Sequence, residues 1–144
     1  MPTAQRSIVI ARSLPAVFEF FADAENDPQW RTAVREIKRD GQLGVGSRYH
    51  QQVAGPGGRA VAADFEVTAY EPDSRVVFQV VAGPVRPRGE YQFSEVEGGT
   101  KVTFILAAEL GVLKRLLMGR PVQKSMDAEM ANLDRAKQIL ETDR

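Results

Sequence analysis

Residues 121–140 read PVQKSMDAEMANLDRAKQIL, and this stretch decides the fold. Its apolar side chains recur at spacings of three and four, which is typical of one face of an amphipathic helix: Val122, Met126, Met130, Leu133, Ala136 and Leu140. Pro121 suits a first helical turn, where its missing N–H needs no partner. Glu129 is the one charged side chain inside the stripe. We predict a long C-terminal helix that starts at Pro121 and covers a sheet.

The rest of the chain reads mostly as strands. Residues 7–11 are a β-branched run, and two short helices should follow it. One is capped by Ser13 with Pro15 in its first turn, and the other spans residues 28–34 and carries Trp30. Alternating apolar residues between Gly- and Pro-rich turns then predict six more strands, at residues 34–39, 47–53, 61–70, 75–81, 89–94 and 100–106.

Tight turns between successive strands indicate an antiparallel sheet with one apolar face. The expected class is therefore α+β: a curved seven-stranded antiparallel sheet wrapped around the long C-terminal helix, with two short helices between the first and second strands. Its 144 residues are expected to form a single domain, residues 1–144, with a sizeable core.

Composition limits the chemistry that the chain can carry. The formal net charge is zero, so no overall field attracts the chain to nucleic acid or to an anionic membrane. There is no cysteine, which excludes disulfides and thiolate ligands, and His50 is the only histidine. We expect no metal and no cofactor. The start of the chain has no apolar signal core and no run is long enough to span a bilayer, so a cytoplasmic protein without stable membrane insertion is expected.

Three stretches and the order of the elements resemble one superfamily. Residues 13–23 followed by Trp30 resemble its opening helix pair, residues 44–47 its turn into the third strand, and residues 97–103 its last hairpin. The chain resembles the helix-grip superfamily, which includes START-related lipid-transfer proteins and polyketide cyclases. The resemblance implies an internal cavity between sheet and helix that holds a hydrophobic or aromatic small molecule. It does not fix the activity, because this architecture serves carriers, sensors and enzymes.

Candidate ligand-binding residues are those expected on the inner face of the sheet, on the C-terminal helix and near the cavity entrance: Trp30, Tyr49, Gln51, Phe65, Phe78, Tyr91, Phe93, Phe104, Met126, Glu129, Met130 and Leu133. Apolar walls with few polar groups are usual for a ligand pocket, and methionine adapts to irregular guests. The competing interpretation is that each of these side chains simply fills the core.

Three of these residues have alternative interpretations. If Glu129 faces the cavity, burial raises its pKa, and it either acts as a general acid or base or holds a polar group of the ligand. Otherwise it is a carboxylate near the pocket mouth, or one paired with an arginine of the sheet such as Arg88. Trp30 is either an aromatic lid or an anchor of the short helix. On the polar strand at residues 47–53 we expect Tyr49 and Gln51 inside and His50 in solvent.

Residues 110–118 are apolar on more than one side, and Lys114, Arg115, Arg120 and Lys124 form a small basic cluster beside them. This cluster either meets phosphate or lipid headgroups or is a solvated surface, and the neutral overall charge favours the solvated surface. The apolar segment is either an extra helical turn over the pocket mouth or part of a homodimer contact. Two functions follow. The first is a carrier or sensor for a small hydrophobic molecule. The second is an enzyme similar to polyketide cyclases and dehydratases, in which Glu129, Tyr49 or Tyr91 directs proton transfer.

Overall fold

The C-terminal helix is present and is longer than predicted. In the computed structural model, which describes residues 2–142, it consists of α2 (Val112–Ala131) and α3 (Leu133–Thr142), separated at Asn132. All six members of the predicted apolar stripe are buried. The predicted start was wrong, because the helix begins nine residues earlier and Pro121 lies in its interior. The apolar residues before Pro121 do not continue the buried stripe, so periodicity could not place this start.

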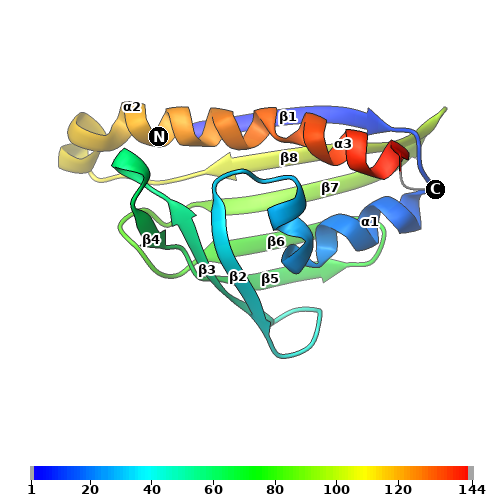
Figure 1. Ribbon diagram of the computed structural model, residues 1–144, viewed down its shortest axis with the longest axis horizontal. Helices are drawn as coiled ribbons and strands as arrows, with labels where there is room; N and C mark the ends of the chain where they lie inside the picture. Colours follow the sequence, from blue (N-terminus) through cyan, green and yellow to red (C-terminus); the bar gives the residue numbers. More distant parts are fainter. Residues whose placement is uncertain (1, 143–144) are drawn as a thin grey trace.

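Seven strands form one curled antiparallel sheet beside this helix (Figure 1). The strands in spatial order are β1 (Thr3–Ile10), β8 (Gly99–Ala107), β7 (Arg88–Val96), β6 (Arg75–Val80), β5 (Phe65–Glu71), β3 (Arg48–Ala54) and β2 (Val34–Asp40). A further short strand, β4 (Ala60–Ala62), pairs with β3 outside this order. This arrangement confirms the α+β helix-grip fold.

The strand predicted at residues 61–70 is interrupted. Asp64 separates β4 from β5, and its carboxylate accepts a hydrogen bond from the backbone N–H of Gln51 at 3.0 Å. The Asp64 side chain thus replaces a backbone carbonyl as the acceptor for one N–H group of β3, and the strand is interrupted there. A register shift between Val67 and Ala69 bends β5 again. Both irregularities increase the curl of the sheet.

Two short helices connect β1 to β2, as predicted, but the second lies earlier than expected. The first, α1 (Leu14–Ala22), has Ser13 as its N-cap, whose hydroxyl accepts a hydrogen bond from the N–H of Ala16 at 3.4 Å. The second is the 3-10 helix η1 (Ala24–Gln29), capped by Asp23. Another 3-10 turn, η2 (Pro56–Gly58), forms in the predicted glycine-rich turn.

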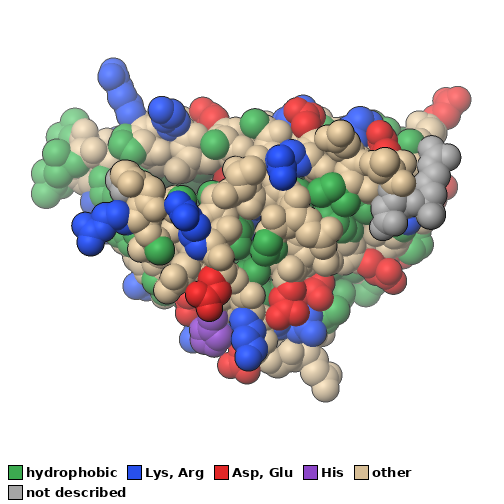
Figure 2. All heavy atoms as spheres, in the orientation of Figure 1, with side chains coloured by type: hydrophobic (Ala, Val, Ile, Leu, Met, Phe, Trp, Pro, Cys, Tyr) green, Lys and Arg blue, Asp and Glu red, His purple; other side chains and the backbone are tan. Residues whose placement is uncertain are grey.

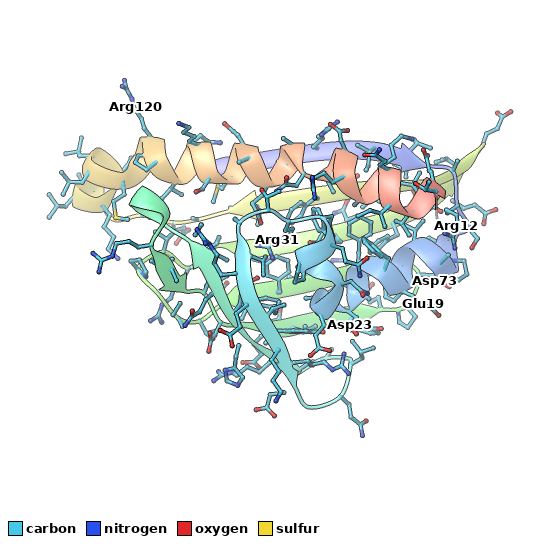
Figure 3. All side chains as sticks on the ribbon, in the orientation of Figure 1. Arg12, Glu19, Asp23, Arg31, Asp73 and Arg120 are labelled. Atoms are coloured by element: carbon cyan, nitrogen blue, oxygen red, sulfur yellow. The ribbon has the colours of Figure 1, made fainter. Side chains whose placement is uncertain are left out.

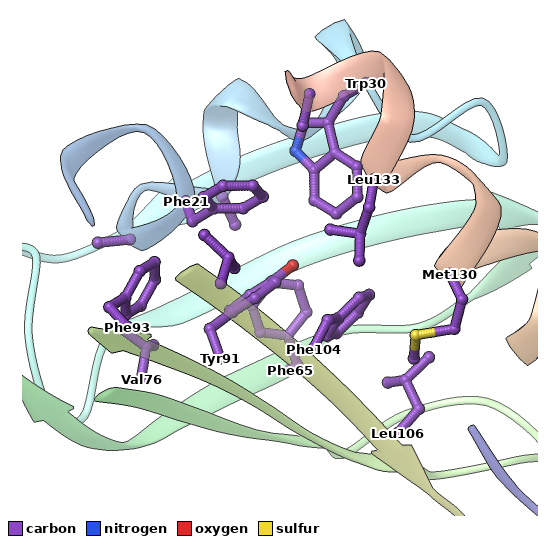
Figure 4. Close-up of a cluster of buried hydrophobic side chains, with 14 of the residues drawn as sticks. Phe21, Trp30, Phe65, Val76, Tyr91, Phe93, Phe104, Leu106, Met130 and Leu133 are labelled. Carbon is purple, nitrogen blue, oxygen red and sulfur yellow. The ribbon is translucent and has the colours of Figure 1, made fainter. Parts of the chain in front are cut away.

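Aromatic rings fill the space between the sheet and the helices at the α1 end of the molecule (Figure 4). Trp30 is fully buried, with its ring centroid 5.3 Å from that of Phe21 and 6.1 Å from that of Phe104. Tyr91 stacks on Phe104 at 4.5 Å. This cluster joins η1 to the inner face of the sheet, so packing at this end leaves little open space.

Candidate functional site

A cavity of about 220 Å³ opens at the other end of the space between sheet and helix. Strands β3, β4, β6 and β8 supply its walls, with the loop between β6 and β7 and the middle of α2. Most of its lining is apolar, including Val53, Val61, Phe78, Val80, Val85, Phe104, Leu106, Met118, Val122 and Met126. An apolar hollow of this kind is typical of a small-molecule site.

One end of the cavity carries a polar cluster of Arg31, Gln51 and Glu129. Arg31 follows η1 directly and lies between β2 and the long helix (Figure 3). Its Nε donates to Glu129 Oε2 at 2.5 Å, and its Nη1 donates to Gln51 Oε1 at 2.9 Å. Gln51 is oriented in turn by the hydrogen bond from its Nε2 to the carbonyl oxygen of Ala63 at 3.1 Å. Hydrogen bonds between Arg31, Gln51 on β3 and Glu129 on α2 therefore fix the arrangement of the cluster.

A second carboxylate supports Arg31 from behind the cavity. Asp27, in η1, accepts a hydrogen bond from Arg31 Nη1 at 2.9 Å and is almost fully buried. Burial raises the pKa of Asp27 to about 6, although the charge and hydrogen bond of Arg31 oppose the shift. Burial acts to lower the pKa of Arg31, but the carboxylates of Glu129 and Asp27 outweigh it and raise that pKa. The Arg31 guanidinium thus contacts two carboxylates, those of Asp27 and Glu129, in a site that is largely shielded from water.

Two hydrogen-bonding atoms of this cluster have no partner among the described residues. Glu129 Oε1 is buried and has no hydrogen-bond partner among the described residues. Arg31 Nη2 likewise makes no hydrogen bond within residues 2–142, while Nε and Nη1 are both engaged. A buried acceptor without a partner is costly, so a molecule that supplies a donor to Glu129 would be favoured here.

The partner of Glu129 differs from the one that we considered. Arg88 bonds Glu90 instead, at 3.3 Å, and does not reach the cavity. Arg31 was missed as a site residue because it follows a short helix and belongs to no strand or amphipathic pattern. One signal was available: Asp27 and Arg31 are four residues apart, a spacing that allows an ion pair.

The twelve predicted site residues fall into three groups. Five line the cavity: Gln51, Phe78, Phe104, Met126 and Glu129. Three others line a separate void of about 20 Å³, namely Tyr49, Phe65 and Tyr91, with Phe78 between the two spaces. The last four lie in the core and line neither space: Trp30, Phe93, Met130 and Leu133. Trp30 is fully buried beside Phe21 and Phe104, a position that supports the anchor interpretation.

The expected orientation of β3 is confirmed. Tyr49 and Gln51 are buried, while His50 is exposed and contacts Asp64 at 3.0 Å. The Tyr49 hydroxyl lies 3.4 Å from Asp23, and burial, together with that carboxylate, raises the pKa of Tyr49 to about 12. Burial likewise raises the pKa of Tyr91 well above its ordinary value. Neither tyrosine lines the main cavity.

No helix within residues 2–142 combines the length and the apolar character needed to cross a bilayer. No curated protein matches the chain. Among solved structures, TTHA0849 from Thermus thermophilus is similar, with a TM-score of 0.80, 20% identity and 98% of each chain covered. The di-domain ARO/CYC StfQ from the steffimycin biosynthetic pathway has a TM-score of 0.79 and 14% identity over 98% of this chain and 51% of its own. DR_A0006 from Deinococcus radiodurans has a TM-score of 0.71 and 19% identity over 97% and 98% of the two chains.

These structural likenesses show a shared fold. The sequence profile of one family also matches residues 1–137, which is nearly the whole chain. That family is described as polyketide cyclase / dehydrase and lipid transport. The chain is a member of the polyketide cyclase / dehydrase and lipid transport family.

Proposed function

We propose that this protein is a carrier or sensor that binds a small, largely apolar molecule in the cavity between its sheet and α2. The observation that carries the proposal is the combination of an apolar hollow with one polar end. The walls come from valine, leucine, phenylalanine and methionine, whereas Arg31, Gln51 and Glu129 meet at a single place. Such a site selects a guest with an apolar body and one polar group.

The size and chemistry of the cavity narrow the ligand class. Its volume of about 220 Å³ exceeds the roughly 150 Å³ of an engineered apolar cavity that binds benzene. A guest of one or two rings therefore suits it. Glu129 Oε1 lacks a donor, so a phenolic or other hydroxyl group at the polar end would complete its hydrogen bonding.

The second candidate is a cyclase-like or dehydratase-like enzyme, and the family description favours it. Acid–base catalysis needs a proton-transferring group within hydrogen-bond reach of the substrate. Among residues 2–142, Glu129 is the one carboxylate that lines the cavity, and Arg31 Nε lies 2.5 Å from its Oε2. Because Tyr49 and Tyr91 lie away from this cavity, we favour the carrier.

The direct test compares two probes of similar shape, 2-naphthol and naphthalene, by equilibrium dialysis. The hydroxyl group should donate to Glu129 Oε1, and a hydrogen bond to a charged group contributes about 1.5–3 kcal/mol, which is roughly tenfold or more in affinity. We expect tighter binding of 2-naphthol in the wild type and a much smaller preference in Glu129→Gln. Equal affinities in the wild type would contradict the polar end, and no binding of either probe would contradict the cavity proposal.

Native mass spectrometry of protein from its own host separates the carrier from the enzyme. A co-purified molecule that is released unchanged after incubation supports the carrier. Its conversion to a product of different mass supports the enzyme. In the second case, loss of conversion in Glu129→Gln would assign the proton transfer to this carboxylate.

A further inference from the structure

The first two turns of α2 leave four large apolar side chains in solvent. Val112, Leu113, Leu116 and Leu117 are 70–79% exposed. Their spacing places them along one side of the helix. Figure 2 shows hydrophobic side chains gathered at the end of the molecule where α2 begins. An exposed apolar group of this size on a short helical segment marks an interaction site.

Basic residues surround this apolar group. Lys114, Arg115, Arg120 and Lys124 are exposed on the same segment, and no acidic residue occurs between Leu110 and Asp127. Arg120 points away from the sheet in Figure 3. The chain as a whole has no net charge, so this local excess of positive charge is a property of the segment alone. An apolar stripe flanked by lysine and arginine is typical of helices that lie on anionic membranes.

The opposite side of the same helix borders the cavity. Met118, Pro121 and Val122 line it, while the exposed leucines point elsewhere. Lys114 Nζ also donates to the carbonyl oxygen of Pro84 at 3.1 Å, and Pro84 lines the cavity as well. A partner surface that binds the start of α2 would therefore lie next to the part of the cavity lined by Pro84 and Met118.

We propose that residues 112–124 form a docking surface for anionic phospholipid membranes, which the apolar side chains enter while the basic side chains contact headgroups. The protein would bind at the membrane surface without spanning it. This proposal does not depend on the cavity ligand. It agrees with a carrier that collects or delivers an apolar molecule at a bilayer, since the cavity and the docking surface share α2.

A second copy of the chain is a poorer occupant. A two-fold interface would bring the same four basic residues of both copies together, and like charges at short distance repel. The exposed segment, residues 112–120, is only about 13 Å long at 1.5 Å per residue. A helical segment of that length is too small to supply, on its own, the roughly 800 Å² of surface that each partner buries in a stable interface. Anionic lipid matches both the apolar stripe and the positive charge.

The test is co-sedimentation of the full chain with phosphatidylcholine vesicles, with and without about 25% phosphatidylglycerol, at about 0.1 M salt. We expect strong binding only to the anionic vesicles and its decrease at about 0.5 M salt. Arg120→Gln/Lys124→Gln should lower the partition coefficient about 25-fold, at about fivefold per basic residue. Leu113→Ser/Leu116→Ser/Leu117→Ser should lower it more than about tenfold.

The matched control is Lys101→Gln/Arg135→Gln, which removes two exposed basic residues elsewhere on the surface and should bind like the wild type. Circular dichroism checks that each variant folds, which is expected because none of the substituted side chains is buried. Equal binding to both vesicle types, or wild-type binding by the triple leucine variant, would overturn the proposal. The proposal would also be overturned if the wild type did not bind vesicles and formed a dimer in analytical ultracentrifugation, while the triple leucine variant was monomeric.

Discussion

At the scale of single residues, the most informative feature is a buried cation that faces two carboxylates. Arg31 contacts Asp27 at 2.9 Å and Glu129 at 2.5 Å, with all three side chains largely removed from water. If all three groups are ionised, the cluster carries one uncompensated negative charge. The raised pKa of Asp27, about 6, is the physical response to burial with that imbalance.

This shift predicts the sign of a pH effect on stability. The pKa of Asp27 rises from 3.8 to about 6 on folding, so folding favours its protonated form. Its contribution to the free energy of unfolding is therefore complete below pH 3.8 and is lost as the pH rises through about 6. Two pKa units correspond to about 3 kcal/mol. We expect Asp27→Asn to remove this decrease in the free energy of unfolding with rising pH. Urea unfolding at several pH values between about 4 and 7 measures it.

A matched control is Asp64→Asn. Burial acts to raise the pKa of Asp64, but hydrogen bonds from His50 and from the backbone of Gln51 lower it. Its contribution to stability is therefore present above pH 3.8 and is lost on acidification, which is the opposite sign. An Asp27→Asn profile that keeps the wild-type slope between about pH 4 and 6 would show that Asp27 is ionised throughout.

At the scale of elements, the cavity wall depends on one glycine. Gly89 in β7 pairs with Phe78 in β6, and a Cβ atom at Gly89 would lie 2.0 Å from Phe78 Cζ. The ring of Phe78 occupies the space above the glycine and forms part of the cavity lining. The absence of a side chain at residue 89 therefore sets the shape of this wall.

We expect Gly89→Ala to reduce the free energy of unfolding by about 1–3 kcal/mol, because the ring must move in a packed environment. Chemical denaturation measures the change. In Gly89→Ala/Phe78→Leu the loss should be smaller than the sum of the single losses, since the two residues are in contact. The control is Gly119→Ala, whose Cβ would lie 3.8 Å from Arg115 Cγ and should be neutral or stabilising by up to about 1 kcal/mol. Additive losses would mean that the ring and the glycine do not interact.

Elements with a regular pattern could be predicted from sequence, and those set by tertiary contacts could not. The stripe from Val122 to Leu140 was correct because period and burial agree there. On β3 the period left both faces open, and the inward face was correct because the apolar ring of Tyr49 favours burial. The start of α2 was wrong because its first turns have no core to face. The break at Asp64 was missed because a side chain replaces a backbone partner, which alternation cannot reveal. Arg31 was missed for a similar reason: its role comes from the meeting of η1, β3 and α2.

At the scale of the whole molecule, the sheet and the long helix are packed at one end and open at the other. Trp30 and the aromatic rings of α1, β7 and β8 fill the first end. Valine, alanine, proline and methionine side chains make up most of the cavity wall at the second end, where Phe78 and Phe104 also contribute. The family could be recognised from short stretches along the whole chain. The division between packed and hollow ends could not, because it depends on which rings from distant segments meet.

This division predicts that ligand binding and stability are coupled through the hollow end alone. A ligand that binds only the folded state adds about 2.7 kcal/mol when its concentration is about 100 times Kd. For a chain of this length, that raises Tm by roughly 5–10 °C. We expect such a rise with 2-naphthol in the wild type, and none in Val53→Trp, whose indole would occupy the cavity. Gln52→Trp is the matched control, because residue 52 is exposed on the other face of β3 and the rise should persist. A ligand-induced rise that survives in Val53→Trp would place the binding site elsewhere in the molecule.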